Sequence, residues 1–354
     1  MNTTELLNNV LTGRRMTEDE FTWLYNEGDF LAIGKAADQI RQHRFPGNTA
    51  SFIIDRNINY TNICSCGCKF CAFFRKKDDP DAYVIDRQTL FTKVEEALEL
   101  GATQLMIQGG LNEDLTIKFF EDMFISVKSR YDITIHSLTA PEIVHIAKIS
   151  NLTIKETLLR LKKSGLDSLP GGGAEVLHDE VRSQISPNKI KTSEWLEVMK
   201  IAHQIGIKTT ATMMMGSVDH LEHRIYHLKK IRELQDETGG FRGFIPWTYQ
   251  PGNNELMGQK ISSVEYLKFL ALSRLYLDNF DHIQCSWLTQ GKRVGLLSLF
   301  FGADDLGSIM IEENVVRSAG LVYKMDKEEM ISMIKTAGRQ PVLRATEYKF
   351  LKCF

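Results

Sequence analysis

Short apolar, β-branched segments alternate with amphipathic stretches of helical period from about residue 50 onward. Such alternation is typical of repeated βα units, in which parallel strands form a sheet that helices cover. We expect strands at residues 49–54, 103–108, 133–137, 165–169, 208–214, 241–247, 282–286 and 306–311. Eight strands with interleaved helices favour an α/β fold of the closed (β/α)8 TIM-barrel type, and a six-unit open barrel is the alternative.

Capping patterns predict where the first helices begin. Thr17 and Glu20 have the spacing of a capping box, and Asp29 is placed as the N-cap of a helix over residues 30–44. Because no linker or internal repeat divides the chain, we expect a single domain. Its expected parts are an N-terminal helical cap at 1–46, the barrel at 47–320, and a C-terminal helix and extended tail packed on the barrel at 321–354.

Composition narrows the class of partner. A formal net charge of −2 over 354 residues gives no bulk attraction to nucleic acid or to a membrane surface, so a small-molecule substrate is expected. The first residues lack a signal peptide, and no run approaches the roughly 18 apolar residues of a membrane span. The expected location is therefore the cytoplasm.

Four of the six cysteines fall within eight residues, and three of them have the spacing C-x3-C-x2-C: Cys64, Cys68 and Cys71. Three thiolates suffice to hold a [4Fe–4S] cluster and leave one iron open to another molecule. A zinc site is the alternative, but it needs a fourth ligand. The extra thiol, Cys66, could in principle replace Cys64 or Cys68.

Unusual polar and glycine-rich segments follow the ends of the expected strands. They are the cysteine loop and residues 108–111, 136–137, 170–175, 213–216, 247–250 and 287–290. In a barrel these strand ends share one rim, which is the face that carries active sites in such folds. The sequence therefore predicts one site assembled from seven segments.

The C-x3-C-x2-C motif after the first strand resembles the signature of the radical S-adenosylmethionine superfamily. Segments 54–62, 108–111, 170–175, 209–214 and 234–241 further resemble the family of cyclases that act on dehypoxanthine futalosine in the futalosine route to menaquinone. The resemblance spans roughly residues 15–350. Two departures from the family pattern are Cys66, where a noncysteine is usual, and Ser137-Leu138, where a glycine and an aromatic residue are usual.

This resemblance implies a [4Fe–4S] cluster on Cys64, Cys68 and Cys71, S-adenosylmethionine as second cofactor, and flavodoxin or ferredoxin as electron donor. The family's radical removes a hydrogen atom from the ribose C4′ of dehypoxanthine futalosine, and the sugar radical closes onto the benzoate ring. Loss of one electron and one proton then restores aromaticity. The alternatives are a sister enzyme, such as aminofutalosine synthase or a deazaflavin-cofactor synthase, and a noncatalytic zinc-binding barrel.

The resemblance also assigns cofactor-binding residues. Phe70 is expected beside the adenine, and Gln108, Gly109 and Gly110 are expected to meet the methionine amino group with backbone oxygens. Glu175 is expected to hydrogen-bond the cofactor's ribose or amino group, and Arg182 to bind a carboxylate of the methionine or of the substrate. The alternatives are a core position for Phe70 and a helix surface for Arg182.

His136 and Glu175 are the expected catalytic residues. A histidine at the end of the third strand could take the proton lost on rearomatisation, because its ordinary pKa lies near neutrality, although many such histidines only make structural hydrogen bonds. Four further polar side chains on the rim are expected to contact the substrate: Tyr60, Asn62, Thr248 and Gln250.

Overall fold

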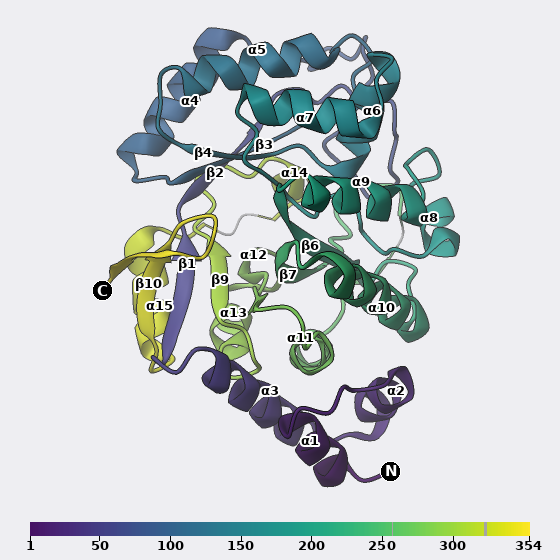
Figure 1. Ribbon diagram of the computed structural model, residues 1–354, viewed down its shortest axis with the longest axis vertical. Coiled ribbons are helices and arrows are strands. Elements are labelled where there is room, and N and C mark those ends of the chain that lie inside the picture. The colour runs from purple at the N-terminus through teal and green to yellow at the C-terminus, as the bar shows by residue number, and fades with distance from the viewer. Residues whose placement is uncertain (257, 322–323) are drawn as a thin grey trace.

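The computed structural model describes residues 1–256, 258–321 and 324–354, and its centre is a parallel β-barrel surrounded by helices (Figure 1). The first barrel strand is divided at Ile54 into two strands, β1 and β2. Seven strands form one sheet in the order β2 (Asp55–Asn59), β3 (Gln104–Gln108), β4 (Thr134–Ser137), β5 (Ser168–Leu169), β6 (Lys208–Met215), β7 (Phe241–Thr248) and β8 (His282–Ile283).

The barrel is closed by β9 (Asp305–Ser308), which pairs in parallel with β1 (Thr49–Ile53). A parallel bridge between Gln284 and Asp305 joins the end of β8 to β9. Counting β1 and β2 as one strand, eight strands surround the interior, so the expected (β/α)8 barrel is confirmed and the open six-unit alternative is wrong.

Helices cover the barrel and its N-terminal side. They are α1 (Thr3–Leu11), α2 (Glu18–Glu27), α3 (Phe30–Arg44), α4 (Arg87–Glu99), α5 (Ile117–Lys128), α6 (Ala140–Ile149), α7 (Ile154–Ser164), α8 (Asp179–Ile185), α9 (Thr192–Gln204), α10 (Leu221–Thr238), α11 (Ser263–Tyr276), α12 (Trp287–Gln290), α13 (Lys292–Ser298), α14 (Val315–Ser318) and α15 (Lys327–Thr336). The capping box of Thr17 and Glu20 is present, and Asp29 caps α3. The helices α1 to α3 lie together at one end of the molecule (Figure 1).

The C-terminal segment differs from the expected extended tail. Instead, β10 (Gln340–Arg344) pairs in parallel with β1, and β11 (Phe350–Cys353) pairs antiparallel with β10. In Figure 1 the yellow β10 lies beside the purple β1, although nearly the whole chain separates them in sequence. The turn between β10 and β11 reaches the N-terminal ends of the barrel strands, where Tyr348 stacks on His282 of β8 with ring centroids 3.5 Å apart.

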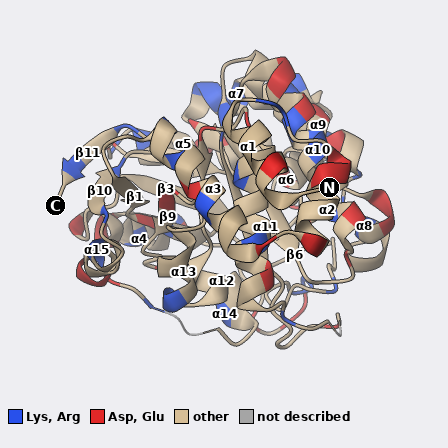
Figure 2. Ribbon diagram, turned by 90° about the horizontal axis from the view of Figure 1, so that it is seen from below, with Lys and Arg blue, Asp and Glu red and all other residues tan. Residues whose placement is uncertain are grey.

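Basic and acidic residues are interspersed along the outer helices (Figure 2). This distribution agrees with the small formal net charge of −2. None of the helices in the described part of the chain is both long and apolar enough to cross a membrane.

Candidate active site

A cavity of about 430 Å³ occupies the interior of the barrel. Its wall includes the cysteine loop at the carboxyl ends of the strands and, at the opposite end, side chains of the turn between β10 and β11. The volume lies within the range of small-molecule sites. The cavity therefore joins the expected cofactor loop to space deep inside the barrel.

The cysteine loop contributes Cys64, Cys66, Cys68 and Cys71 to the cavity wall, all as free thiols. Burial raises the pKa of the Cys64 and Cys71 thiols, whereas a hydrogen bond from Cys66 lowers the pKa of Cys68 to about 7. The Cys66 and Cys68 sulfur atoms lie 3.5 Å apart. A soft set of three spaced thiols on one loop, with a fourth as hydrogen-bond donor, fits the ligand chemistry of an iron–sulfur cluster.

The glycine motif after β3 packs directly against this loop. A Cβ atom on Gly110 would lie 2.1 Å from the carbonyl oxygen of Ile63, and one on Gly109 would lie 2.6 Å from the ring of Tyr60. Both positions require glycine because a side chain would displace what lies behind it. Gln108, Gly109 and Gly110 all line the cavity, where the sequence places them as cofactor contacts.

The loop after β5 brings Glu175 to the cavity. Its backbone has φ of +41°, an uncommon value for a non-glycine residue, and its Oε1 accepts a hydrogen bond from Lys189 Nζ at 3.1 Å. Its Oε2 is buried without a hydrogen-bond partner among the described residues. Lys189 also lies over the ring of Phe70, 5.2 Å from the centroid, and Phe70 is in the cavity wall. Glu175 Oε2 lies 3.9 Å from Arg182 Nη1, so the carboxylate of Glu175 is held between two cationic side chains.

Arg182 does not line the cavity. Its guanidinium donates to the backbone carbonyls of Ile190 at 3.0 Å, Ala174 at 2.6 Å and Gly173 at 3.2 Å. The carboxylate-binding role expected from the sequence is therefore corrected, because these donors already have acceptors. Arg182 supports the glycine-rich loop that presents Glu175.

His136 lies in the cavity wall on β4 and is buried. Its Nδ1 is 2.7 Å from Ser168 Oγ, and that hydroxyl donates to the carbonyl of Lys208 at 3.0 Å. Since the serine hydrogen is used in this way, Nδ1–H donates to Ser168 and Nε2 is left as the basic nitrogen. Burial and the nearby Arg242 and Arg344 guanidinium groups hold the pKa of His136 well below its usual value, so the ring is neutral.

Three of the four expected substrate contacts lie behind the cavity wall instead of in it. Tyr60 is buried and donates to Glu142 Oε1 at 2.8 Å. Thr248 Oγ1 accepts hydrogen bonds from Gln290 Nε2 at 2.6 Å and Gln250 Nε2 at 3.2 Å. The direct roles of Tyr60, Thr248 and Gln250 are corrected, because their polar atoms satisfy one another or a neighbouring side chain.

Asn62 does line the cavity, but both ends of its amide hold the following loop. Its Nδ2 donates to the Asp81 carbonyl at 2.8 Å, and its Oδ1 accepts from the Tyr83 N–H at 2.9 Å. A contact of Asn62 with substrate stays a prediction.

Several polar residues of the cavity were not predicted from the sequence. Glu142 accepts hydrogen bonds from Tyr60 and from the Gly109 N–H at 3.1 Å, and burial raises its pKa to about 7. The capping box that Thr139 and Glu142 form at the start of α6 was a readable signal for this residue. Others include Asp55, Gln104, Lys189, Arg242, Arg344, Thr346 and Tyr348, and most of these lie toward the N-terminal ends of the strands.

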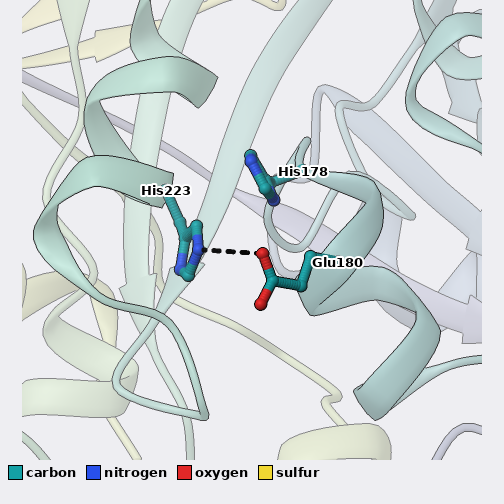
Figure 3. Close-up of side chains that lie close together, drawn as sticks. All are labelled: His178, Glu180 and His223. Carbon is teal, nitrogen blue, oxygen red and sulfur yellow. Dashed lines mark ion pairs between the residues drawn. The ribbon is translucent and has the colours of Figure 1, made fainter.

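A separate cluster outside this cavity contains His178, Glu180 and His223, whose nearest ligand atoms lie within 4.8 Å of one another (Figure 3). His223 Nδ1 accepts the backbone N–H of His220 at 3.1 Å, so the neutral ring carries its proton on Nε2. That nitrogen faces Glu180 Oε2 at 3.8 Å. The histidine is therefore arranged as a donor to the carboxylate and not as a metal ligand.

Comparison with protein families gives two matches that follow each other along the chain. Residues 58–231 match the radical SAM superfamily, and residues 238–354 match the CofH/MqnC C-terminal region. The second match contains β7, β9, β10 and the turn that closes the cavity. Both ends of the cavity therefore belong to matched segments.

Similar proteins extend over nearly the full chain. Cyclic dehypoxanthine futalosine synthase of Streptomyces coelicolor is 46% identical over 98% of this chain and 88% of that protein. The enzyme of the same name from Halalkalibacterium halodurans is 39% identical, covering 99% and 95%. The 5-amino-6-(D-ribitylamino)uracil–L-tyrosine 4-hydroxyphenyl transferase of Archaeoglobus fulgidus is 42% identical, covering 90% and 93%.

Solved structures with the same fold include methylornithine synthase (PylB), with a TM-score of 0.75 at 18% identity over 95% of this chain and 97% of that one. The hydrogenase maturase HydG from Carboxydothermus hydrogenoformans has a TM-score of 0.77 at 17% identity over 98% and 80%. At these identities the likeness concerns the fold alone.

Proposed function

The chain belongs to the CofH/MqnC family of radical SAM enzymes, and on that premise we propose that it converts dehypoxanthine futalosine to cyclic dehypoxanthine futalosine in menaquinone biosynthesis. The observation that carries the proposal is one continuous cavity that joins the C-x3-C-x2-C loop to the interior of the barrel. The 46% identity to the Streptomyces enzyme over almost the whole chain supports this choice of reaction.

In this proposal Cys64, Cys68 and Cys71 hold a [4Fe–4S] cluster, and S-adenosylmethionine binds beside it. Together these cofactors supply a 5′-deoxyadenosyl radical when bound. The chain's part is to bind, to orient and to exclude water. Gly109 and Gly110 give a backbone edge without side chains, Phe70 offers an apolar face, and Glu175 places a carboxylate in the cavity wall.

His136 is proposed as the acceptor of the proton lost when the benzoate ring regains aromaticity. Its ring is neutral, its Nδ1–H is held by Ser168, and it lies in the cavity wall. A neutral imidazole with a fixed tautomer can accept a proton at Nε2 without first losing one.

We also propose a cytoplasmic location and electron delivery by a flavodoxin or a ferredoxin. A cluster with an exchangeable iron ligand needs a reducing compartment, and six free cysteines agree with one. The formal net charge of −2 favours neither nucleic acid nor a membrane as partner.

The test is anaerobic incubation of the reconstituted, reduced protein with S-adenosylmethionine and dehypoxanthine futalosine. The expected product is two hydrogens lighter than the substrate, and 5′-deoxyadenosine is formed with it. A parallel reaction supplies L-tyrosine and 5-amino-6-(D-ribitylamino)uracil, which the name of the Archaeoglobus relative specifies. Turnover only in that second reaction would refute the cyclase proposal and move the chain to the transferase branch.

Alanine variants of the four loop cysteines test the ligand set. Cys64→Ala, Cys68→Ala and Cys71→Ala are each expected to abolish 5′-deoxyadenosine formation, whereas Cys66→Ala serves as the matched control and should stay active after reconstitution. Wild type should contain about four irons with acid-labile sulfide. A dead Cys66→Ala beside one active variant of the other three would refute the assignment, and about one zinc without sulfide would refute the enzyme.

A further inference from the structure

Arg242 brings a positive charge into the cavity without an acidic partner. Its Nη1 donates to the carbonyl oxygen of Thr346 at 2.9 Å, and its Nη2 donates to Ser168 Oγ and lies 3.5 Å from His136 Nδ1. The acceptors on Thr346 and Ser168 are neutral, and Nε is buried without any acceptor in the described part of the chain. A guanidinium has five N–H donors, so several of them lack an acceptor.

Three other arginines, each more deeply buried than Arg242, have acidic partners. Arg344 pairs with Asp305 through Nε at 2.5 Å and Nη2 at 3.0 Å, Arg224 pairs with Asp219 and Glu265, and Arg274 pairs with Asp304. For Arg242 no ion pair exists among residues 1–256, 258–321 and 324–354. Because an uncompensated charge in a buried site is costly, this contrast calls for an anion from outside the chain.

A local irregularity of β7 directs Arg242 inward. In the pairing of β6 with β7, Thr209 lies opposite Phe241 but Ala211 lies opposite Phe244, so β7 holds one extra residue between these pairs. Without it, strand alternation from the inward-facing Ile245 and Trp247 would turn residue 242 outward. Bulges of this kind re-aim side chains next to active sites.

We propose that Arg242 is the subsite for a carboxylate of the substrate. The assignment rests on the proposed function, in which that group is the benzoate carboxylate of dehypoxanthine futalosine. Gln104 and Thr210 line the same cavity as neutral polar side chains. A benzoate fixed there directs the sugar toward the cysteine-loop end of the cavity.

Binding at Arg242 also bears on His136. The guanidinium is one of the positive charges that lower the pKa of this histidine, and Arg242 Nη2 lies 3.5 Å from His136 Nδ1. A bound carboxylate offsets that charge and favours proton acceptance by the imidazole. Substrate binding thus prepares the proposed base.

The test compares two ligands on the reconstituted protein with S-adenosylmethionine but without reductant, so that binding is measured without turnover. One ligand is dehypoxanthine futalosine, and the other is its benzamide analogue, in which a neutral amide replaces the carboxylate. Wild type is expected to prefer the carboxylate by about 10- to 100-fold in Kd, the range of a charge-assisted hydrogen bond. Arg242→Gln should lose most of this preference, and Arg242→Lys should keep part of it.

Arg56→Gln is the matched control, because Arg56 is a largely buried arginine outside the cavity, paired with Glu96 and Glu312, and should keep the wild-type preference. If Arg242→Gln does not fold, the preference of wild type for the carboxylate and its partial retention in Arg242→Lys still test the subsite. Equal affinity of wild type for both ligands, or an unchanged preference in Arg242→Gln, would overturn the subsite.

Failure of the proposed function gives a different result. If wild type neither binds nor converts dehypoxanthine futalosine, the cyclase proposal falls, and the subsite is then tested with 3-acetylbenzoate against 3-acetylbenzamide. A preference for the benzoate that depends on Arg242 supports the carboxylate subsite on its own. No preference for either probe overturns it.

Discussion

Gly110→Ala is expected to disturb the geometry of the cysteine loop while the barrel stays folded. The added Cβ would lie 2.1 Å from the Ile63 carbonyl oxygen and 2.7 Å from the Cys64 Cβ. Real Cβ atoms essentially never come closer than 3.0 Å to such neighbours, so the first contact alone requires a movement of at least 0.9 Å. The backbone carbonyl cannot rotate away freely, because Ile63 forms a β-bridge with Arg75 and the Cys64 N–H donates to Arg75.

The displacement falls on the loop that presents the first cysteine. Overpacking of this kind costs about 1–3 kcal/mol of stability, which a barrel of this size survives as a folded protein. Misplacing a reacting group by about 1 Å costs about 100-fold in rate. We therefore expect a loss of activity much larger than the loss of folded protein.

The assay measures initial 5′-deoxyadenosine formation with excess S-adenosylmethionine and reductant, iron content per chain, and urea unfolding of the same preparations. Gly47→Ala is the control, because its Cβ would meet only Thr49 Cγ2 at 3.6 Å, an ordinary contact. A Gly110→Ala protein with wild-type iron content and a rate within about threefold of wild type would refute the argument.

Three further outcomes follow from the contacts described above. Tyr60→Phe should lower the free energy of unfolding, measured in urea, by about 1–3 kcal/mol, because Glu142 loses its hydroxyl donor. The Kd for substrate should stay unchanged, and a larger Kd would restore Tyr60 as a substrate contact. Burial lowers the pKa of His227 to about 3, so protonation below pH 6.5 favours the unfolded chain, and this residue should lower the free energy of unfolding by about 2 kcal/mol at pH 5. In His227→Gln the free energy of unfolding should therefore decline less between pH 7 and pH 5. An equally steep decline in the variant would count against this reasoning. Arg344→Met should lower the free energy of unfolding by about 3–5 kcal/mol, because the carboxylate of Asp305 is left buried and uncompensated. Adding Asp305→Leu should recover part of this loss, as measured by thermal unfolding. No recovery in the double variant would contradict the reasoning.

Features that depend on neighbours in sequence were predictable. The capping box of Thr17 and Glu20 and the N-cap of Asp29 are present because each uses atoms only three residues apart. The strand order followed from the βα alternation, since parallel neighbours connected by a helix leave few topologies. The cysteine loop, the glycine motif and Glu175 also lie in one cavity, since the carboxyl ends of barrel strands meet on one rim.

The direction of side chains at the strand ends was predicted less well. On β2 the cavity is lined by Asp55, Asn57 and Asn59, so alternation turns Tyr60 away from it. The same alternation turns Thr248 outward after the inward-facing Trp247. A position on the rim therefore does not by itself predict a ligand contact. The alternation of inward and outward side chains along each strand decides which residues can meet a ligand.

The closed end of the cavity was not predictable from local pattern. The pairing of Thr49 with Gln340 and the hydrogen bond from Thr346 Oγ1 to Gln104 Oε1 join residues far apart in the chain. No periodicity in residues 341–351 specifies which strand edge they pair with. Arg242 was missed for a related reason, since the extra residue in β7 reverses the alternation that would place it outside.

The two ends of the cavity place different demands on the chain. At the cysteine loop, the ring of Tyr60 fixes Gly109 and the backbone of Ile63 fixes Gly110, which leaves little freedom for change. At the opposite end, Arg242 holds a charge that forms no ion pair among the described residues, and its position depends on one inserted residue. Selection among substrates is therefore more readily built at the Arg242 end, where removing a single residue from β7 would withdraw the guanidinium without touching the loop that holds the cofactors.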